Sequence, residues 1–187
     1  MSFLFVSSLL TYIRKTLTHV PWSHWAVMGV LSLGLTILIL KRKNSSVYSA
    51  IALGITVFIG LFLLDVAVVI RYCGMMHHIA GYNLTLSFSR FLQKDGQGPA
   101  EMTSNIAIFT LFGFFLSEFL STTKHFRPWR RLGIASLISF CLSLCTECLQ
   151  LVLHVGFFEL TDLVMNTVGG FIGAGAALLG RRLIYDS

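Results

Sequence analysis

Five long apolar segments, separated by short polar connections, constrain the fold more than any other feature of this sequence. A transmembrane helix needs about 20 consecutive, mostly apolar residues, and each segment is close to that length. We therefore predict an all-α fold, a polytopic transmembrane helix bundle with about five spans. The predicted spans are Trp22–Leu40, Val47–Ile70, Ser104–Leu120, Leu132–His154 and Leu163–Gly180.

The composition also favours a membrane location. Hydrophobic residues make up 55% of the 187 residues, charged residues make up only 12%, and the mean hydropathy is +0.78. This is too little polar surface to cover a soluble domain of the same size. The formal net charge of +6 does not indicate a nucleic-acid partner, because the basic residues lie in connections beside the apolar spans.

Loop charges predict the orientation of the bundle. With five spans, the connection after the first span, the connection after the third span and the C-terminal tail lie on one side of the membrane. Because basic connections are enriched on the cytoplasmic side, we predict a multi-pass protein with a cytoplasmic C-terminus. These three segments hold nine of the fourteen lysines and arginines: Lys41, Arg42, Lys43, Lys124, Arg127, Arg130, Arg131, Arg181 and Arg182.

The first twenty residues form a separate predicted segment. Met1 to Ile13 is apolar but too short to span a bilayer, and it lacks the basic start of a cleavable signal. We predict an amphipathic interfacial helix over residues 1–20 that places Leu10 and Ile13 in the lipid; a half-inserted segment is the alternative. Residues 21–187 are then a single transmembrane bundle.

The acidic residues gather on the predicted outer side. A charged side chain at bilayer depth costs roughly 2.5 to 3.5 kcal/mol, so such residues face a protein interior or a wet cavity. Asp65 and Glu147 lie within roughly 10 Å of the outer ends of their helices, at 1.5 Å per residue. We predict that they share one water-accessible pocket. The six outer acids are Asp65, Asp95, Glu101, Glu147, Glu159 and Asp162.

Helical spacing places polar groups of the last two spans on single faces. Glu147, Gln150 and His154 share one face of the fourth span, and Asp162 and Asn166 share one face of the fifth. Asp162 has two interpretations that do not exclude each other. It stands where a helix N-cap is expected, and it can also be a site residue.

Small residues suggest close helix contacts. Gly169, Gly170 and Gly173 form a small-xxx-small track, and Gly113 lies on one face of the third span with Asn105. Such tracks let two helices approach closely in lipid, within one chain or between two copies, so the oligomeric state stays open. For Asn105 we weigh a hydrogen bond across the bundle to Glu147 or Asn166 against a ligand contact.

The cysteines do not predict a metal site. Cys141, Cys145 and Cys148 form a stripe along one helix, where their thiols stand too far apart to chelate one ion. Cys73 stands alone, so no disulfide is implied. We predict neither a metal nor a cofactor.

Three motifs together resemble the VanZ-like family. They are Ser104-Asn105 with Gly113, then Glu147-Cys-Leu-Gln150, then Thr161-Asp162 with Asn166-Thr-Val-Gly169-Gly170. The resemblance runs from about Asn83 to Gly173, within a VanZ-like core that we place at residues 83–180. It implies a multi-pass protein of the bacterial cytoplasmic membrane. The family's namesake is an accessory determinant of resistance to teicoplanin, a glycopeptide antibiotic. Residues matching the family's recurrent positions are Asn105, Glu147, Gln150, Asp162, Asn166 and Gly169.

Two functions from different classes remain open. The protein is either a non-enzymatic accessory factor in glycopeptide resistance, acting through an outward-facing acidic and amide pocket, or an intramembrane enzyme. As an enzyme it would use Glu147 and Asp162 as acid and base on a lipid-linked envelope substrate. No activated serine or cysteine is visible, so a covalent nucleophile is not indicated. The expected partners are membrane lipids and either a lipid-linked envelope molecule or a lipoglycopeptide.

Overall fold

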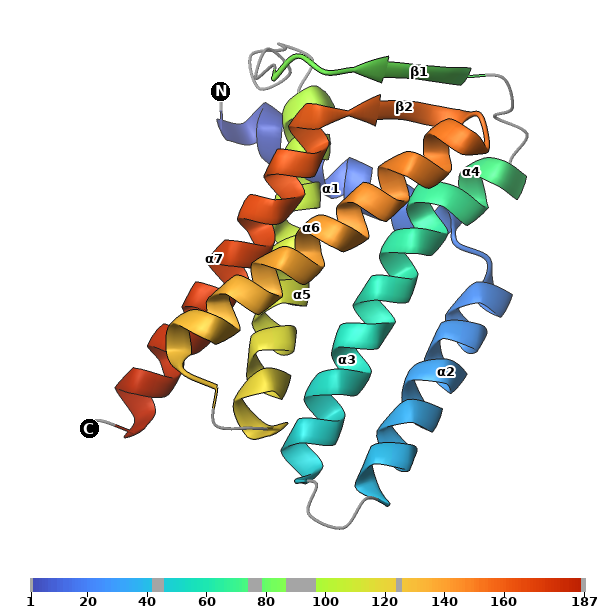
Figure 1. The fold of residues 1–187 in the computed structure, drawn as a ribbon. Coiled ribbons are helices and arrows are strands. Elements are labelled where there is room, and N and C mark those ends of the chain that lie inside the picture. The colour runs from blue at the N-terminus through green and yellow to red at the C-terminus, as the bar shows by residue number, and fades with distance from the viewer. Residues whose placement is uncertain (1, 42–45, 74–78, 87–96, 124–125, 186–187) are drawn as a thin grey trace.

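The structure of the protein is a computed structural model that describes residues 2–41, 46–73, 79–86, 97–123 and 126–185. Arg42, Lys43, Asp95 and Lys124, which entered the charge analysis, lie outside these residues. Helices form nearly all of it, in the order shown in Figure 1. The elements are α1 (Ser2–His19), α2 (Trp22–Leu40), α3 (Val47–Leu64), the π-helix η1 (Asp65–Val69), α4 (Ile70–Cys73), β1 (Ile79–Asn83), α5 (Gln97–Thr123), α6 (Pro128–Val152), β2 (Val155–Glu159) and α7 (Leu160–Tyr185).

The predicted class of fold is confirmed. Five helical segments of the described chain are long and apolar enough to cross a membrane, namely Trp22–Leu40, Val47–Cys73, Pro99–Thr122, Pro128–Val152 and Leu160–Leu183. The third is longer than the predicted Ser104–Leu120. Pro128 begins α6, where its missing N–H costs no hydrogen bond.

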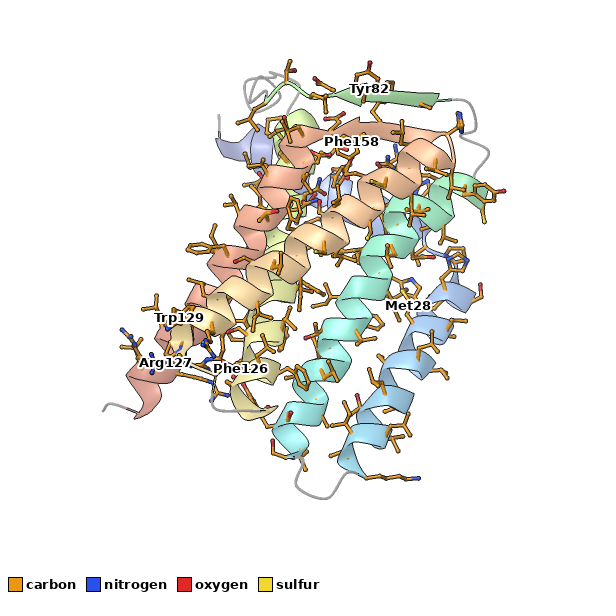
Figure 2. The ribbon with its side chains drawn as sticks, viewed as in Figure 1. Met28, Tyr82, Phe126, Arg127, Trp129 and Phe158 are labelled. Carbon is orange, nitrogen blue, oxygen red and sulfur yellow. The ribbon has the colours of Figure 1, made fainter. Side chains whose placement is uncertain are left out.

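The bundle has two distinct ends (Figure 1). The strand end carries β1, β2 and the start of α7. The C-terminal end carries the last turns of α2, α5 and α7 and the first turns of α3 and α6. Figure 2 places Arg127 and Trp129 at the C-terminal end, and Arg130 stacks on Trp129 with its guanidinium 5.2 Å from the ring centre.

Helices α5 and α7 cross with their backbones in close approach, and the four glycines singled out from the sequence lie at this crossing. A Cβ added to Gly113 would meet the carbonyl of Gly170, and one added to Gly173 would meet the backbone of α5. A Cβ on Gly169 would lie 2.6 Å from the Ile106 oxygen. Side chains larger than hydrogen therefore cannot occupy these positions without moving a helix.

The buried face of α6 is made of small residues that lead up to the polar groups. Ala135, Ser139 and Ser143 are spaced four residues apart and are fully buried, and Glu147 continues the same face towards the strand end. A Cβ on Gly170 of α7 would meet the Ser139 side chain. The cysteine stripe of α6 lies elsewhere on the helix and is exposed, as expected for lipid-facing thiols.

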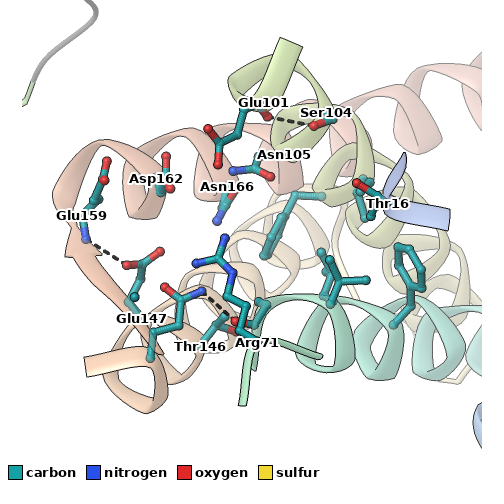
Figure 3. Close-up of a pocket in the computed structure, with 18 of the residues that line it drawn as sticks. Thr16, Arg71, Glu101, Ser104, Asn105, Thr146, Glu147, Glu159, Asp162 and Asn166 are labelled. Carbon is teal, nitrogen blue, oxygen red and sulfur yellow. Dashed lines mark hydrogen bonds between the residues drawn. The ribbon is translucent and has the colours of Figure 1, made fainter. Parts of the chain in front are cut away.

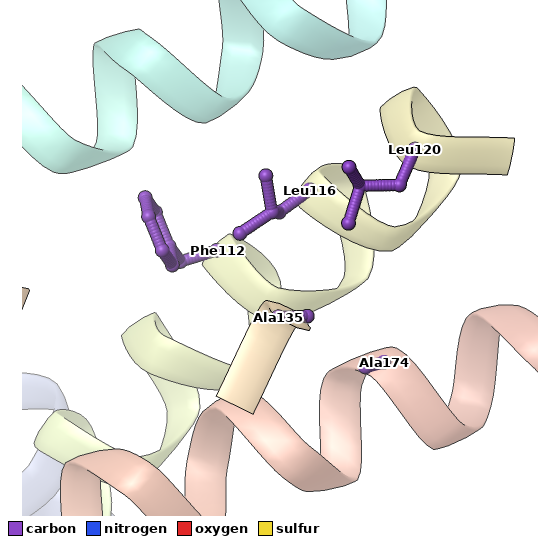
Figure 4. Close-up of a cluster of buried hydrophobic side chains, with 5 residues drawn as sticks. All are labelled: Phe112, Leu116, Leu120, Ala135 and Ala174. Atoms are coloured by element: carbon purple, nitrogen blue, oxygen red, sulfur yellow. The ribbon is translucent and has the colours of Figure 1, made fainter. Parts of the chain in front are cut away.

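An apolar cluster stabilises the bundle between its middle and the C-terminal end (Figure 4). Its core consists of Phe112, Leu116 and Leu120 from α5, packed against Ala135 of α6 and Ala174 of α7. The alanines let the bulky α5 side chains fill the space between the helices. This packed region fixes the helices on which the polar residues of the strand end are mounted.

The strand pair at the other end is an element that the sequence did not predict. β1 and β2 are parallel, with Ile79 opposite Val155 and Asn83 opposite Glu159. A Cβ on Gly81 would lie 2.5 Å from the Phe157 ring, so this ring covers the backbone of β1. The pair ties the connection that follows α4 to the connection between α6 and α7.

Helix α1 is amphipathic and is not one of the five potential spans. Its exposed apolar residues Val6, Leu10, Ile13 and Leu17 follow helical spacing and form one stripe. Other residues of α1 face cavities in the protein. In Figure 1 the helix crosses the strand end behind α5 and α7 instead of running along the bundle. An interfacial helix would turn such a stripe towards lipid.

Candidate functional site

A cavity of about 600 Å³ lies at the strand end, surrounded by α1, the η1 and α4 segments, α5, α6 and α7, with β2 beside it. Its volume is in the range of small-molecule sites. The prediction that Asp65 shares a pocket with Glu147 is wrong, because Asp65 is not in the cavity wall and its Oδ1 lies 2.7 Å from His24 Nδ1. Five other polar residues predicted from the sequence do line the cavity, and Figure 3 labels four of them, all except Gln150. They are Asn105, Glu147, Gln150, Asp162 and Asn166.

Glu147 is held by the segment that follows its own helix. The residue is only 4% exposed, and its Oε2 accepts a hydrogen bond of 2.8 Å from the backbone N–H of Glu159. The chain leaves α6, runs along β2 and passes the Glu147 carboxylate before it enters α7. A backbone N–H therefore fixes one oxygen of the carboxylate, and the Glu147 side chain lines the cavity.

Gln150 is held by the π-helix. Its Nε2 donates a hydrogen bond of 3.1 Å to the carbonyl oxygen of Ala67 within η1. A π-helical turn changes the i→i−4 hydrogen-bond pattern, and such turns occur often at functional sites. The amide of Gln150 thus ties α6 to the irregular segment of the second span.

Asn166 and Asn105 differ in their bonding. Asn166 Nδ2 donates to the Ser143 hydroxyl at 2.9 Å, while Asn166 Oδ1 is buried and has no hydrogen-bond donor in the described part of the chain. The predicted alternative, a bond from Asn105 to Glu147 or Asn166, does not form, because the Asn166 amide pairs with α6 instead. Asn105 lines the cavity.

Asp162 is not the N-cap that the sequence suggested. Helix α7 begins at Leu160, so Asp162 lies inside its first turn. The helix starts earlier because β2 leads directly into it. A carboxylate in the first turn still interacts favourably with the positive end of the helix dipole, and its side chain lines the cavity.

The expectation that His154 shares a face with Glu147 and Gln150 is wrong. Helix α6 ends at Val152, and His154 adopts a left-handed backbone conformation with φ of 56°. Its ring is exposed, and its Nδ1 lies 3.1 Å from the Val152 oxygen. The chain must turn here to enter β2, so the helical spacing used for the prediction no longer applies.

Sequence reasoning missed several residues of the cavity wall. Arg71 and Glu101 line it from α4 and α5, and Tyr12 and Lys15 line it from α1. Burial raises the pKa of the Tyr12 hydroxyl, and the nearby Glu101 carboxylate raises it further. The polar face of α1 was the sequence signal for Tyr12 and Lys15. Arg71 carries no such signal, because a basic residue directly after an apolar span is common whether or not it lines a site.

Charges of both signs therefore line the cavity. Arg71 and Lys15 supply positive charge, and the carboxylates of Glu101, Glu147, Glu159 and Asp162 supply negative charge. Among the described residues, no three of His, Cys, Asp and Glu come together as metal ligands would. The arrangement suits hydrogen bonding and ion pairing with a polar organic group, and Phe62, Ile108 and Phe109 supply apolar wall.

The fold and this cavity define a multi-span helical membrane protein with a polar cavity at one end of its bundle. Within that class the family is clear: the VanZ/LLP1 family profile matches residues 66–181, and the chain belongs to this family. The match begins at residue 66, in η1, and not near residue 83 as the sequence suggested. It therefore includes Arg71 together with every cavity residue of α5, α6 and α7.

A curated relative supports the assignment. Protein VanZ of Enterococcus faecium is 33% identical over 75 residues, which is 39% of this chain and 41% of the relative. The aligned part thus spans about two-fifths of the relative's length. No solved structure matches the chain.

Proposed function

We propose that the protein is an accessory factor in glycopeptide resistance that acts from the bacterial cytoplasmic membrane through the cavity at its strand end. The single observation that carries this proposal is the cavity itself, lined by the five carboxylate and amide residues of the VanZ-like motifs. A role in bundle packing alone would favour side chains that satisfy one another. Here a space of about 600 Å³ remains between them.

The proposed orientation places this cavity outside. The C-terminal end carries Lys41, Arg127, Arg130, Arg131, Arg181 and Arg182 among its described residues. Basic residues of this kind are retained on the cytoplasmic side. The strand end then faces outward, where a lipoglycopeptide and its targets meet the membrane.

The proposed action is binding of an amphiphile in the outer leaflet. Teicoplanin carries a fatty acyl tail, and lipid-linked envelope molecules share this amphiphilic character. A protein that binds the polar group of such a molecule changes how the antibiotic meets the envelope without catalysing a reaction. The mixed charges and apolar wall of the cavity support a polar group attached to a lipid.

Susceptibility of cells tests this proposal. Glu147→Gln and Asp162→Asn keep the shape of each side chain and remove its charge, and we expect either change to abolish the protein's effect on teicoplanin susceptibility. Cys148→Ser is the matched control, because Cys148 follows Glu147 on the same helix and is exposed. Unchanged susceptibility in both charge variants, at membrane expression equal to the control, contradicts the proposal.

Catalysis is the second candidate function, and one feature favours it. The Glu147 and Asp162 carboxylates line the same cavity from different helices, as an acid and base acting on one substrate would. A lipid profile separates the two functions. An envelope lipid or precursor whose amount depends on Glu147 supports an enzyme, and identical profiles for wild type and Glu147→Gln support a binder.

A further inference from the structure

We propose that the cavity takes a zwitterionic phospholipid head group, with its phosphodiester on Arg71 and its primary amine among the carboxylates. This inference rests on the proposed function, because it names the class of amphiphile that the same cavity binds. The starting observation is the state of Arg71. It lines the cavity, yet it forms no hydrogen bond or ion pair with any residue that the structure describes.

The π-helix before Arg71 sets the direction of its side chain. Arg71 belongs to α4, the single turn that follows the π-helix η1. Each residue of an α-helix advances the side-chain direction by roughly 100°, so the extra residue of a π-helical turn rotates everything after it by about that angle. Figure 3 shows the Arg71 guanidinium reaching into the space between Glu147 and Asn166.

The residues around Arg71 restrict the position of its guanidinium. A Cβ added to Gly156 of β2 would lie 3.0 Å from Arg71 Nη1 and 3.1 Å from Gln150 Oε1. The guanidinium thus lies directly against the Gly156 backbone. A planar group held in this way presents several N–H donors in a fixed arrangement, which matches the two oxygens of a phosphodiester.

A second observation points to an N–H donor on the ligand. Asn166 is 7% exposed and lines the cavity, and its buried Oδ1 has no donor among the described residues. Buried carbonyl oxygens normally accept a hydrogen bond, so this one favours a ligand that brings a donor. A primary ammonium group has three N–H donors and opposite charge to the surrounding carboxylates.

The charge balance excludes simpler ligands. A purely anionic head group would pair with Arg71 and Lys15 but would also face the four carboxylates of the wall, and a purely cationic one would face Arg71 and Lys15. A head group that carries both charges a few ångströms apart pairs with both sets. This chemistry is shared by phosphatidylethanolamine and by aminoacyl esters of phosphatidylglycerol.

Space for the rest of the lipid adjoins the head-group cavity. A second cavity of about 550 Å³ lies between α1 and the η1 and α4 segments. It shares part of its wall with the first cavity, including Tyr12, Lys15, Val66 and Glu101. Since α1 carries its exposed apolar stripe beside this space, a glycerol ester can pass along α1 towards lipid.

Native mass spectrometry of the delipidated full-length protein in detergent tests the proposal. The probes are phosphatidylethanolamine and lysyl-phosphatidylglycerol, which have phosphate and primary amine, against phosphatidylglycerol, which lacks the amine, and phosphatidylcholine, which lacks N–H donors. We expect at least tenfold tighter binding of one or both amine lipids. Whichever amine lipid binds more tightly identifies the source. Equal binding of all four lipids overturns the proposal.

Variants test separately the proposed phosphodiester contact at Arg71 and the proposed amine contacts with the carboxylates. Arg71→Gln should weaken binding of the preferred amine lipid at least tenfold, whereas Arg130→Gln, an exposed arginine at the opposite end, should leave it unchanged. The double variant Glu101→Gln/Asp162→Asn should bind that lipid no better than phosphatidylglycerol. Full-strength binding by Arg71→Gln overturns the proposal. The result is independent of antibiotic susceptibility, so the proposed cellular function and this ligand assignment can fail separately.

Discussion

Arg181 and Glu118 form an ion pair near the C-terminal end of the bundle, and breaking it should strongly destabilise the fold. Arg181 Nη2 donates to Glu118 Oε2 at 2.7 Å, and its Nε lies 3.1 and 3.0 Å from the two carboxylate oxygens. The Tyr48 hydroxyl donates to the same carboxylate. Glu118 is only 4% exposed, so its charge depends on these partners.

Arg181→Met removes the ion pair and leaves the buried carboxylate with the Tyr48 hydrogen bond and the charge of Arg131 nearby. An uncompensated buried charge costs about 3 to 5 kcal/mol, whereas replacing both partners by apolar residues of similar size is often neutral. Because part of Arg181 is exposed, we take the lower figure, about 3 kcal/mol, or more than a hundredfold in the folding equilibrium. Glu118→Met/Arg181→Met should recover most of this loss.

Unfolding in mixed micelles of a mild detergent and dodecyl sulfate, followed by tryptophan fluorescence, measures these differences. Arg182→Met is the matched control, because the neighbouring arginine is exposed and should change stability by less than about 0.5 kcal/mol. The reasoning is refuted by an Arg181→Met variant as stable as the control. It is also refuted by a double variant less stable than Arg181→Met, since the cost would not then come from a stranded carboxylate.

Three further predictions test other parts of the structure. Gly173→Ala should cost about 1 to 3 kcal/mol in the same unfolding assay because its Cβ would collide with the α5 backbone, whereas Gly175→Ala, whose Cβ meets nothing within 4 Å, should be neutral or stabilising. A Tyr82→Cys variant in a background with the native cysteines changed to serine should react with an impermeant maleimide on intact cells; reaction only after permeabilisation would invert the orientation. Gly156→Ala should displace the Arg71 guanidinium and weaken amine-lipid binding several-fold without changing any charge, and unaltered binding would show that Arg71 is not positioned there.

The spans could be predicted from the sequence because hydropathy and helical spacing are local properties. Each polar residue of the VanZ-like motifs lies on an apolar span or at its end, where few arrangements avoid exposing it to lipid. Helices α6 and α7 pack together, and their polar residues face the interior near the same end of the bundle. This brings together Glu147, Gln150 and Asn166. The cavity they line therefore follows from the same periodicity that predicts the spans.

The strand pair and Arg71 could not be predicted in this way. β1 and β2 are only five residues each, and residues 84–154 separate them in the sequence. Neither segment therefore carries a local pattern strong enough to indicate a strand. Arg71 reaches the cavity because the π-helix η1 rotates the helical turn that follows it. One extra residue in the hydrogen-bonding pattern does not change the hydropathy of the segment. The strand pair depends on contacts between distant segments and the position of Arg71 depends on an irregular helix, so both are visible only in the structure.

The buried acid at the C-terminal end and the acids of the cavity at the strand end have different partners, and the difference supports the proposed ligand at the strand end. At the C-terminal end, Glu118 is matched by Arg181 and Tyr48, which is how a structural charge is stabilised in an apolar environment. At the strand end, Arg71 and four carboxylates line one cavity, and Arg71 pairs with none of them within the described chain. Arg131 Nε at the C-terminal end is also buried without a hydrogen-bond partner among the described residues, so an unpaired arginine nitrogen does not by itself require a ligand. Arg71 differs in its position: it is partly exposed and lines a cavity together with carboxylates and the Asn166 amide, which leaves its N–H donors available to the proposed head group.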